Sequence, residues 1–542
     1  MTLAGFVSLL RGPGRDRARA RAHVRAEADR HVRELVGDWD EFAAHVGDTR
    51  GQGLVVGTAR TSTGRDVSVH LAFDDLYRHG LISGASGSGK TSMATWILAS
   101  CLRTAMPIGV VDFKSDLFEA ALRWYAAIVA QAPEAERPAL ARRAAVVNPF
   151  GESLVPLNVC RLLPGATPET QAYEVALALA KLFDAQMGFQ MQNVLVHLWL
   201  FLAETELTLA EAPLVLQDEA VRNALLTRVQ HPGVREFFGR TYPGVPSSSK
   251  DALITRLGAL VLSENLRLQL GADECIDFRA IFDRGDPLVM FLGKGGHVAQ
   301  ELVEVVGSLF LQLIFQAAFA RGGARRPYLV LCDEFFHLAA DSPALTRRFE
   351  TALTTLRSFG VLLGLVMHNF AQVHGSLREA ILGNCDLMAI FRTSSRNAQF
   401  FGEFLPDTDP EVVAQALRRT GKAPSRFESR GVLLEQLQRL PDRTCWWYDR
   451  RKPYKAIRLR VPDVPAPHTA AGITERELER LIVEYGIRRG GLAQPKEVLR
   501  EQIAKRRQRL EALVRPRIEI VSPVEPLTQP LAAGRPRVAR VG

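Results

Sequence analysis

Cysteine is scarce and scattered in this chain of 542 residues: there are six cysteines, and none of them forms a CxxC pair. This spacing argues against a disulfide framework and a zinc knuckle, and it predicts a protein of the reducing cytoplasm. The sequence also lacks a run of about twenty apolar residues, which a membrane-spanning helix needs. The strongest candidate, residues 306–320, includes Gln312 and Gln316, and we expect a buried core helix there.

An export signal is missing as well. Positive charge follows the short apolar stretch at the N-terminus instead of preceding it, which is the reverse of a signal peptide. We therefore expect no transmembrane segment and a cytoplasmic location.

The composition is that of a globular protein larger than one ordinary domain. Hydrophobic residues make up 47% of the chain, enough to bury a large core. Lysine and arginine total 68 against 59 acidic residues, for a formal charge of +9. This excess favours an anionic partner, and nucleic acid fits it better than lipid.

Short apolar runs separated by helical stretches predict buried strands of a mainly parallel, doubly wound α/β sheet. Two β-prone pieces precede them, at residues 53–57 and 67–71, and two pieces that resemble edge strands follow, at 444–448 and 456–461. The seven expected buried strands are residues 81–83, 108–112, 145–147, 288–292, 329–332, 361–367 and 387–391.

A glycine-rich segment after the first buried strand matches the phosphate-binding pattern GxxxxGK[ST] at residues 84–91. Its glycines let backbone N–H groups turn toward phosphate oxygens, and the N-terminus of the helix that follows adds positive potential. We expect Lys90 to contact the β and γ phosphates of ATP and Thr91 to bind Mg²⁺. The predicted nucleotide-binding residues are Gly84, Ala85, Ser86, Gly87, Ser88, Gly89, Lys90, Thr91 and Ser92.

A second motif complements the P-loop. The apolar run at residues 328–332 ends in Asp333 and Glu334. Asp333 is expected to hold Mg²⁺ through water, and Glu334 to orient or deprotonate the attacking water. Two acids after an apolar run are common at ordinary strand ends, but together with Lys90 they indicate an ATP-hydrolysing site.

Several further segments match a known superfamily. They are residues 110–116, similar to VVDxKGD; 148–150 with 156–158; 276–279 ahead of 293–296; and Asn384 ahead of Phe391 and Arg392. With the P-loop, they resemble the FtsK/HerA superfamily of hexameric nucleic-acid pumps, in particular the ATPase domain of type IV secretion coupling proteins (TraD/TraG-like). The resemblance spans about residues 50–460. It implies a RecA-like P-loop NTPase core plus an all-α insertion domain.

The resemblance also implies two catalytic residues. Arg357 aligns with the arginine that similar motors insert into the neighbouring subunit's ATP site, although an ordinary surface arginine at a helix end fits the sequence too. His368 occupies the position of the family's sensor glutamine, and a plain buried histidine is equally compatible with the pattern. Asp112 and Lys114 follow a buried strand, where polar residues often mark only the exit into solvent.

These patterns divide the chain into six parts. The sequence predicts a helical N-terminal arm (1–49), a first part of the ATPase core with a β lead-in (50–163), an all-α insertion (164–283), a second part of the core (284–462), a linker with basic helices (463–514) and a Pro/Arg-rich tail expected to be disordered (515–542). The basic helix at about residues 495–514 could contact DNA phosphates, dock a partner or form only a solvated face.

The function that these motifs favour is a ring-forming DNA translocase, a homo-oligomer that the resemblance implies is a hexamer, using ATP and Mg²⁺. The missing anchor favours a soluble pump for DNA transfer, processing, mobile elements or defence, which a membrane-anchored partner could recruit. The alternative is a secretion or recruitment ATPase that acts on a protein substrate. A GTPase switch lacks support because no NKxD motif occurs.

Overall fold

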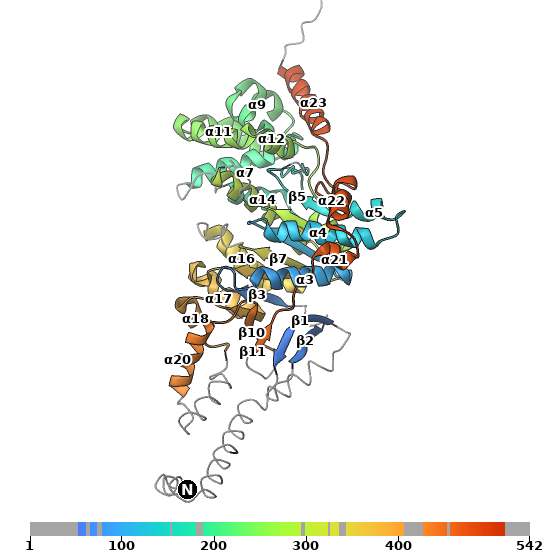
Figure 1. Ribbon diagram of the computed structural model, residues 1–542. Coiled ribbons are helices and arrows are strands. Elements are labelled where there is room, and N and C mark those ends of the chain that lie inside the picture. Colours follow the sequence, from blue (N-terminus) through green and yellow to red (C-terminus); the bar gives the residue numbers. More distant parts are fainter. Residues whose placement is uncertain are drawn as a thin grey trace, which may run out of the picture.

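The structure, a computed structural model, forms a broad sheet with helices on both faces (Figure 1). It describes residue 26 and residues 53–60, 66–72, 78–151, 154–179, 188–293, 299–322, 326–334, 343–405, 426–451 and 456–514. The predicted arm (apart from residue 26), the predicted tail and residues 294–296 of one family motif lie outside the described residues.

The strands of the described residues form one eleven-stranded sheet in the order β2-β1-β11-β10-β9-β3-β8-β7-β4-β6-β5. From β9 to β5 all neighbours are parallel. The parallel strands are β3 (His79–Ser83), β4 (Ile108–Asp112), β5 (Ala145–Val147), β6 (Leu288–Phe291), β7 (Tyr328–Asp333), β8 (Val361–Met367) and β9 (Cys385–Phe391). They correspond to the seven predicted apolar runs, so the α/β class with a mainly parallel sheet is confirmed.

An antiparallel extension continues the sheet beyond β9. It consists of β10 (Thr444–Asp449), β11 (Ile457–Arg460), β1 (Gly53–Arg60) and β2 (Asp66–Ala72). The prediction that residues 444–448 and 456–461 are edge strands is wrong, because β10 pairs with β9 and β11, and β11 pairs with β10 and β1. The β1–β2 hairpin, far away in sequence, moves the edge to β2.

The parallel strands are apolar throughout because both of their faces are covered. Along β7, Val330 and Cys332 belong to one buried cluster, whereas Leu329 and Leu331 belong to the other. This alternation is the two-residue period of a strand, with each face packed against helices instead of water.

Two sets of helices provide this cover. One face packs against α3 (Lys90–Arg103), α4 (Asp116–Gln131) and α22 (Glu475–Glu484), with α5 (Arg137–Ala141) and α21 (Pro467–Ala471) beside α4. The other face packs against α14 (Gln300–Phe319), α16 (Pro343–Thr355), η6 (Leu356–Phe359), α17 (Gly375–Asn384), α18 (Ser395–Phe401) and α20 (Arg426–Leu437). A short turn of helix, η7 (Phe370–Gln372), follows β8.

Helix α14 contains the predicted core helix. By length and composition its stretch Glu301–Phe319 could span a membrane, but 78% of that stretch is buried inside the protein. A bent helix pair, α7 (Phe189–Glu204) with η3 (Leu209–Glu211) and α8 (Ala212–Gln217), passes the same test only when it is counted as one broken span. The burial of α14 agrees with the prediction of a core helix at residues 306–320.

Between β5 and β6 the described residues form helices, and their one strand-like contact is an isolated bridge between Leu157 and Cys275. The helices are α6 (Pro168–Leu179), α7 (Phe189–Glu204), η3 (Leu209–Glu211), α8 (Ala212–Gln217), α9 (Glu219–Leu226), α10 (Pro232–Glu236), η4 (Phe237–Thr241), η5 (Tyr242–Gly244), α11 (Ser247–Leu262), α12 (Glu264–Leu270) and α13 (Phe278–Arg284). They form the upper part of Figure 1, and their apolar side chains join the cluster that contains α14.

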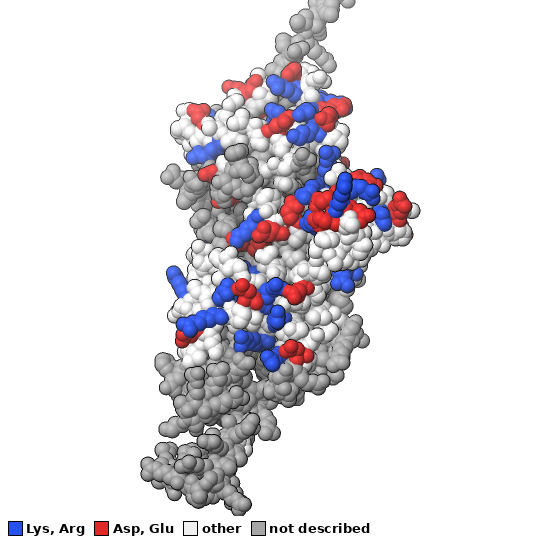
Figure 2. All heavy atoms as spheres, viewed as in Figure 1, with Lys and Arg blue, Asp and Glu red and all other residues white. Residues whose placement is uncertain are grey.

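The basic C-terminal helix α23 (Lys496–Val514) packs against these insertion helices. Arg506 is buried, and its guanidinium pairs with Glu211 and Asp273. Arg500 pairs with Glu264 at 2.7 Å. Two of the basic side chains of α23 are therefore paired with acidic residues of the chain itself. Figure 2 likewise shows acidic and basic side chains intermixed where α4 and α22 lie.

The segment before α23 protects the exposed edge of β5. Gly491 donates its N–H to the carbonyl of Ala144 at 3.0 Å, and a Cβ at this position would lie 1.9 Å from the carbonyl oxygen of Arg142. Because the close atom belongs to the backbone, the contact cannot relax by a side-chain rotation. Only glycine allows this approach.

Replacing Gly491 by alanine is expected to destabilise the protein by about 1–3 kcal/mol, because the methyl group must displace one of two packed backbones. Gly258→Ala is the matched control, because space is open around this position inside α11, and alanine there is expected to be neutral or stabilising. Urea unfolding measures the free energy of unfolding of both variants. Equal stability of Gly491→Ala and wild type would contradict the steric account.

Candidate nucleotide site

The loop between β3 and α3 has the conformation that its glycines permit. Gly87 and Gly89 have φ of 71° and 112°, values that residues with a side chain rarely adopt. The Ser88 hydroxyl donates to the carbonyl of Ala85 at 2.7 Å and closes the loop. Gly84 is equally constrained, because a Cβ there would lie 2.5 Å from that of Phe391. The loop is thus shaped by local glycines and by a close neighbouring strand.

Three distant segments hold this loop in place. Gly84 donates its N–H to Met367 at the end of β8, at 3.3 Å, and Ala85 donates to Arg392 after β9, at 2.6 Å. Arg443 donates its N–H to the carbonyl of Ser88 at 2.8 Å and has a positive φ of 59°. No pattern in the sequence around Arg443 indicates this role, because its contact with the loop forms only when β10 joins the sheet.

Lys90 begins α3 and lies inside the loop. Its Nζ donates to the carbonyl of Ala85 at 2.8 Å, and the residue is 8% exposed. Burial lowers the pKa of the ammonium, the charge of Lys114 lowers it further, and Asp333 and Glu334 oppose this. The next residue, Thr91, is exposed in the first turn of the helix. Lysine, hydroxyl and helix N-terminus therefore converge as a phosphate-binding loop requires.

The acidic pair lies at the same end of the sheet. β8 separates β3 from β7, so the two strands that lead to Lys90 and Asp333 are about 10 Å apart. Asp333 is 6% exposed, and burial together with the charges of Asp112 and Glu334 raises its pKa to about 7. Lys114 and Lys90 act against that rise. The predicted phosphate-binding lysine and metal-binding acid thus belong to one group of interacting charges.

Asp112, whose role the sequence left open, is the direct neighbour of Asp333 in the register of β4 and β7. It is fully buried, and burial raises its pKa. Its carboxylate accepts hydrogen bonds from the N–H of Lys114 at 2.7 Å and of Phe118 at 2.8 Å. Asp112 therefore orders the turn between β4 and α4 instead of ending the strand in solvent.

Glu334 follows the end of β7 with a positive φ of 54°. Its N–H donates to Val366 at 2.9 Å, and its carboxylate forms an ion pair with Lys114. A left-handed conformation in a non-glycine residue is uncommon and clusters at functional sites. The backbone here turns the side chain toward the end of the sheet where the P-loop lies.

His368 lies directly after β8 and beside the P-loop. Burial lowers its pKa, the charges of Lys90 and Lys114 lower it further, and Glu334 and a hydrogen bond with the Gly84 backbone oppose this. Its imidazole is therefore neutral at pH 7, a form that can both donate and accept a hydrogen bond. The structure brings the histidine into the predicted site, while its role as a sensor stays a prediction.

Arg357 lies elsewhere. It belongs to η6, before β8 begins, whereas the P-loop follows the other end of the parallel strands. The seven residues of β8 separate the two ends by about 20 Å. Its side chain is 54% exposed and lies 3.7 Å from a carboxylate oxygen of Asp386. The structure therefore does not bring Arg357 to the phosphate loop of its own chain.

His79, at the start of β3, is a titratable group near Arg357. Burial and that arginine lower its pKa from 6.5 to about 4. Its Nδ1 accepts a hydrogen bond from the N–H of Leu363 at 2.9 Å. The neutral imidazole thus links β3 to β8 below the site.

Lowering the pH from 6.5 to 4 is expected to remove up to about 3 kcal/mol of stability through His79, because the unfolded chain binds the proton first. This contribution is fully present above pH 6.5 and lost as pH falls to 4. His79→Asn retains an acceptor for Leu363 without titrating. Unfolding of both proteins in urea across this range tests the prediction, and parallel curves would refute it.

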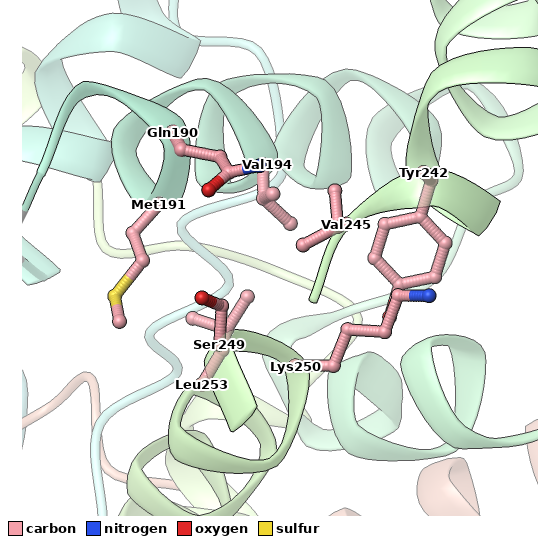
Figure 3. Close-up of a pocket in the computed structure, with 8 residues that line it drawn as sticks. All are labelled: Gln190, Met191, Val194, Tyr242, Val245, Ser249, Lys250 and Leu253. Carbon is pink, nitrogen blue, oxygen red and sulfur yellow. The ribbon is translucent and has the colours of Figure 1, made fainter. Parts of the chain in front are cut away.

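A second hollow lies between α7 and α11 (Figure 3). The hollow has a volume of about 10 Å³ for the centre of a water molecule, which is just enough for one water. Lys250 lies 4.8 Å from the ring centre of Tyr242 at its rim. The hollow is therefore too small for a nucleotide, and the P-loop is the better candidate site.

Comparison with known proteins gives one kind of match. No protein-family model and no curated protein matches the chain significantly. Among solved structures, it is similar to the bacterial conjugative coupling protein TrwBΔN70 (14% identity, 79% of this chain and 92% of that one, TM-score 0.47). It is also similar to VirB4 of Thermoanaerobacter pseudethanolicus (12%, 77% and 98%, TM-score 0.49) and to the plasmid coupling protein TrwB in complex with ADP and Mg²⁺ (14%, 79% and 93%, TM-score 0.46). These structures include the type of coupling protein that the motifs resemble.

Proposed function

We propose that this chain is a Mg²⁺-dependent ATPase whose hydrolysis of ATP moves DNA through a ring of identical subunits in the cytoplasm. The observation that supports the proposal most is the convergence of Lys90, Asp333 and Glu334 at the carboxyl ends of β3 and β7, the two parallel strands on either side of β8. In open α/β sheets this end is where ligands bind.

The donor groups fit Mg²⁺. Thr91 offers a hydroxyl and Asp333 a carboxylate, which are hard oxygen ligands. Burial raises the pKa of Asp333, the charges of Asp112 and Glu334 raise it further, and a cation would stabilise the ionised carboxylate against both effects. No cluster of three or more metal-binding side chains occurs among the described residues. Mg²⁺ in phosphate sites typically takes only one or two protein ligands and keeps several waters. When bound here, it would supply positive charge beside the β and γ phosphate oxygens.

Hydrolysis in this arrangement uses the chain's own residues for positioning and proton transfer. A water oxygen attacks the γ phosphorus, and the bond to the bridging oxygen breaks so that ADP leaves with the electron pair. Glu334 accepts the proton of the water. Lys90 stabilises the charge on the transferring group, and neutral His368 can hydrogen-bond the water or a phosphate oxygen.

Arg357 enters the mechanism only across a subunit interface. Arg357 lies far from the P-loop of its own chain, and its side chain is exposed. Both facts agree with a role as an arginine finger that reaches a neighbouring subunit of a ring. The family resemblance implies that this ring is a hexamer. Mixed rings of Arg357→Ala and Lys90→Ala subunits should recover part of the ATPase activity, because some interfaces join an intact finger to an intact loop. Absence of recovery, with co-assembly proven, would argue against this role.

DNA is the substrate that the charge and the resemblance favour. The formal charge of +9 suits a polyanion, and contacts with the phosphate backbone predict binding that weakens steeply with salt. The experiment is ATP hydrolysis by the purified protein with and without single- or double-stranded DNA. An unchanged rate under both conditions would remove DNA from the proposal while leaving the ATPase intact.

A protein substrate is the second candidate. Two large apolar side chains of the insertion are strongly exposed: Phe189 is 93% exposed and Leu262 is 85% exposed. Apolar patches on a surface can mark sites of protein contact, and these two side chains are where a substrate protein would gain apolar burial. In a secretion or recruitment ATPase, DNA would leave the rate of ATP hydrolysis unchanged. The protein substrate would raise that rate, and Phe189→Ser would abolish the increase.

A further inference from the structure

Lys114 is held in a defined place by the turn after β4. Asp112 accepts the N–H of Lys114 itself and, with its other oxygen, the N–H of Phe118 in the first turn of α4. Between them, Ser115 has a positive φ of 89°. Because the buried carboxylate of Asp112 satisfies both N–H groups, the backbone at Lys114 is fixed relative to β7.

The side chain of Lys114 reaches the carboxylate of Glu334 across the end of the sheet. Its Nζ pairs with Oε1 of that residue. The two partners differ in exposure: the lysine side chain is 48% exposed, whereas the glutamate side chain is 5% exposed. The half-exposed side chain of Lys114 can therefore change its position, whereas the buried side chain of Glu334 is confined to its place.

Lys114 also lies near the expected position of the phosphates. Its partner Glu334 donates its N–H to Val366, and the next residue, Met367, accepts the N–H of Gly84 in the P-loop. The charge of Lys114 also lowers the pKa of Lys90 and of His368. Lys90 is the residue expected to contact the β and γ phosphates. A γ phosphate in the loop would therefore place a second anion within reach of Lys114.

We propose that Lys114 is a positioning residue that pairs with Glu334 in the absence of ATP and moves to the γ phosphate when ATP binds. The inference rests on the proposed ATPase function. While Lys114 is paired with Oε1 of Glu334, its positive charge lowers the basicity of the carboxylate, so Glu334 is a weaker acceptor for the proton of the attacking water. The exchange of partners frees the oxygen only when a triphosphate is present, since ADP has no γ phosphate to attract the lysine.

This exchange predicts that ATP and ADP respond differently to substitutions. In Lys114→Ala, affinity for the ATP analogue ATPγS with Mg²⁺ should fall about tenfold, the effect of one charge-assisted hydrogen bond, while affinity for ADP stays within about twofold. The KM for ATP should rise more than kcat falls, because Lys114 no longer lowers the basicity of Glu334. Lys114→Arg should restore the preference for ATPγS.

Glu334→Gln is the complementary variant, because it removes the competing carboxylate without touching Lys114. Its affinity for ATPγS should rise about threefold to fivefold, the contribution of a partly exposed ion pair, with ADP affinity unchanged. The double variant should lose that gain. Lys505→Ala, which removes a lysine 62% exposed on α23, is the matched control for a changed net charge.

The outcomes separate the two proposals. If wild type binds neither ATPγS nor ADP with Mg²⁺, both the ATPase function and this inference fail. If wild type binds and hydrolyses ATP but the ratio of ATPγS to ADP affinity is the same in wild type, Lys114→Ala and Glu334→Gln, only the inference fails. Should Lys114→Ala not fold, Glu334→Gln and Lys114→Arg decide the question alone.

Discussion

Replacing Lys90 by alanine should abolish Mg²⁺-dependent ATP binding and lower hydrolysis at least about 10³-fold, to background. The structure explains the size of this effect. The ammonium lies inside the loop with the carbonyl of Ala85 as its hydrogen-bond acceptor, and a phosphate oxygen would replace that acceptor. Isothermal titration with ATPγS and a phosphate-release assay measure both quantities.

The fold should tolerate this change. A lysine that is 8% exposed is costly to bury, so its removal is expected to alter the free energy of unfolding by no more than about 1 kcal/mol. Lys505→Ala is again the control for the lost charge. ATPγS binding within tenfold of wild type in Lys90→Ala would contradict the assignment of the loop.

Glu334→Gln should reduce kcat by about 10²–10⁴-fold while ATP stays bound, because the amide cannot accept the proton of the attacking water. The two side chains have nearly the same shape, so the left-handed backbone at this position and its hydrogen bond to Val366 should persist. Single-turnover measurement with rapid quenching separates the chemical step from product release.

A trapped complex is the positive sign of this variant. The protein should retain unhydrolysed ATP after gel filtration, whereas Lys90→Ala should retain none. Turnover near the wild-type rate would remove Glu334 from the mechanism. Of the two acids at the end of β7, Asp333 would then be the one with a role in hydrolysis.

Much of the architecture was predictable because it is local. The run from residue 361 to residue 367 is apolar at every position, and such runs are typical of strands covered on both faces. The predicted core helix at residues 306–320 forms the greater part of α14 and is too apolar to face water. In both cases the composition of a short segment was sufficient.

The position of strands in the sheet was not predictable in the same way. The pieces at residues 444–448 and 456–461 are short and flanked by turns, as edge strands are, yet both are paired on two sides. β11 pairs with β1, about four hundred residues earlier in the chain, and β10 lies between β11 and β9. The partners of two arginines of α23 were likewise not predictable, because Arg500 and Arg506 pair with Glu264, Glu211 and Asp273 in another part of the fold.

The sequence by itself determined the phosphate loop, because glycine conformations and a helix N-terminus are properties of adjacent residues. It also determined the strand that ends in Asp333 and Glu334. Only the tertiary structure decided that Lys114 pairs with Glu334, that Arg443 supports the loop and that Arg357 lies away from it. Each of these contacts joins residues far apart in the chain, so its geometry depends on how the sheet orders its strands and not on any spacing in the sequence.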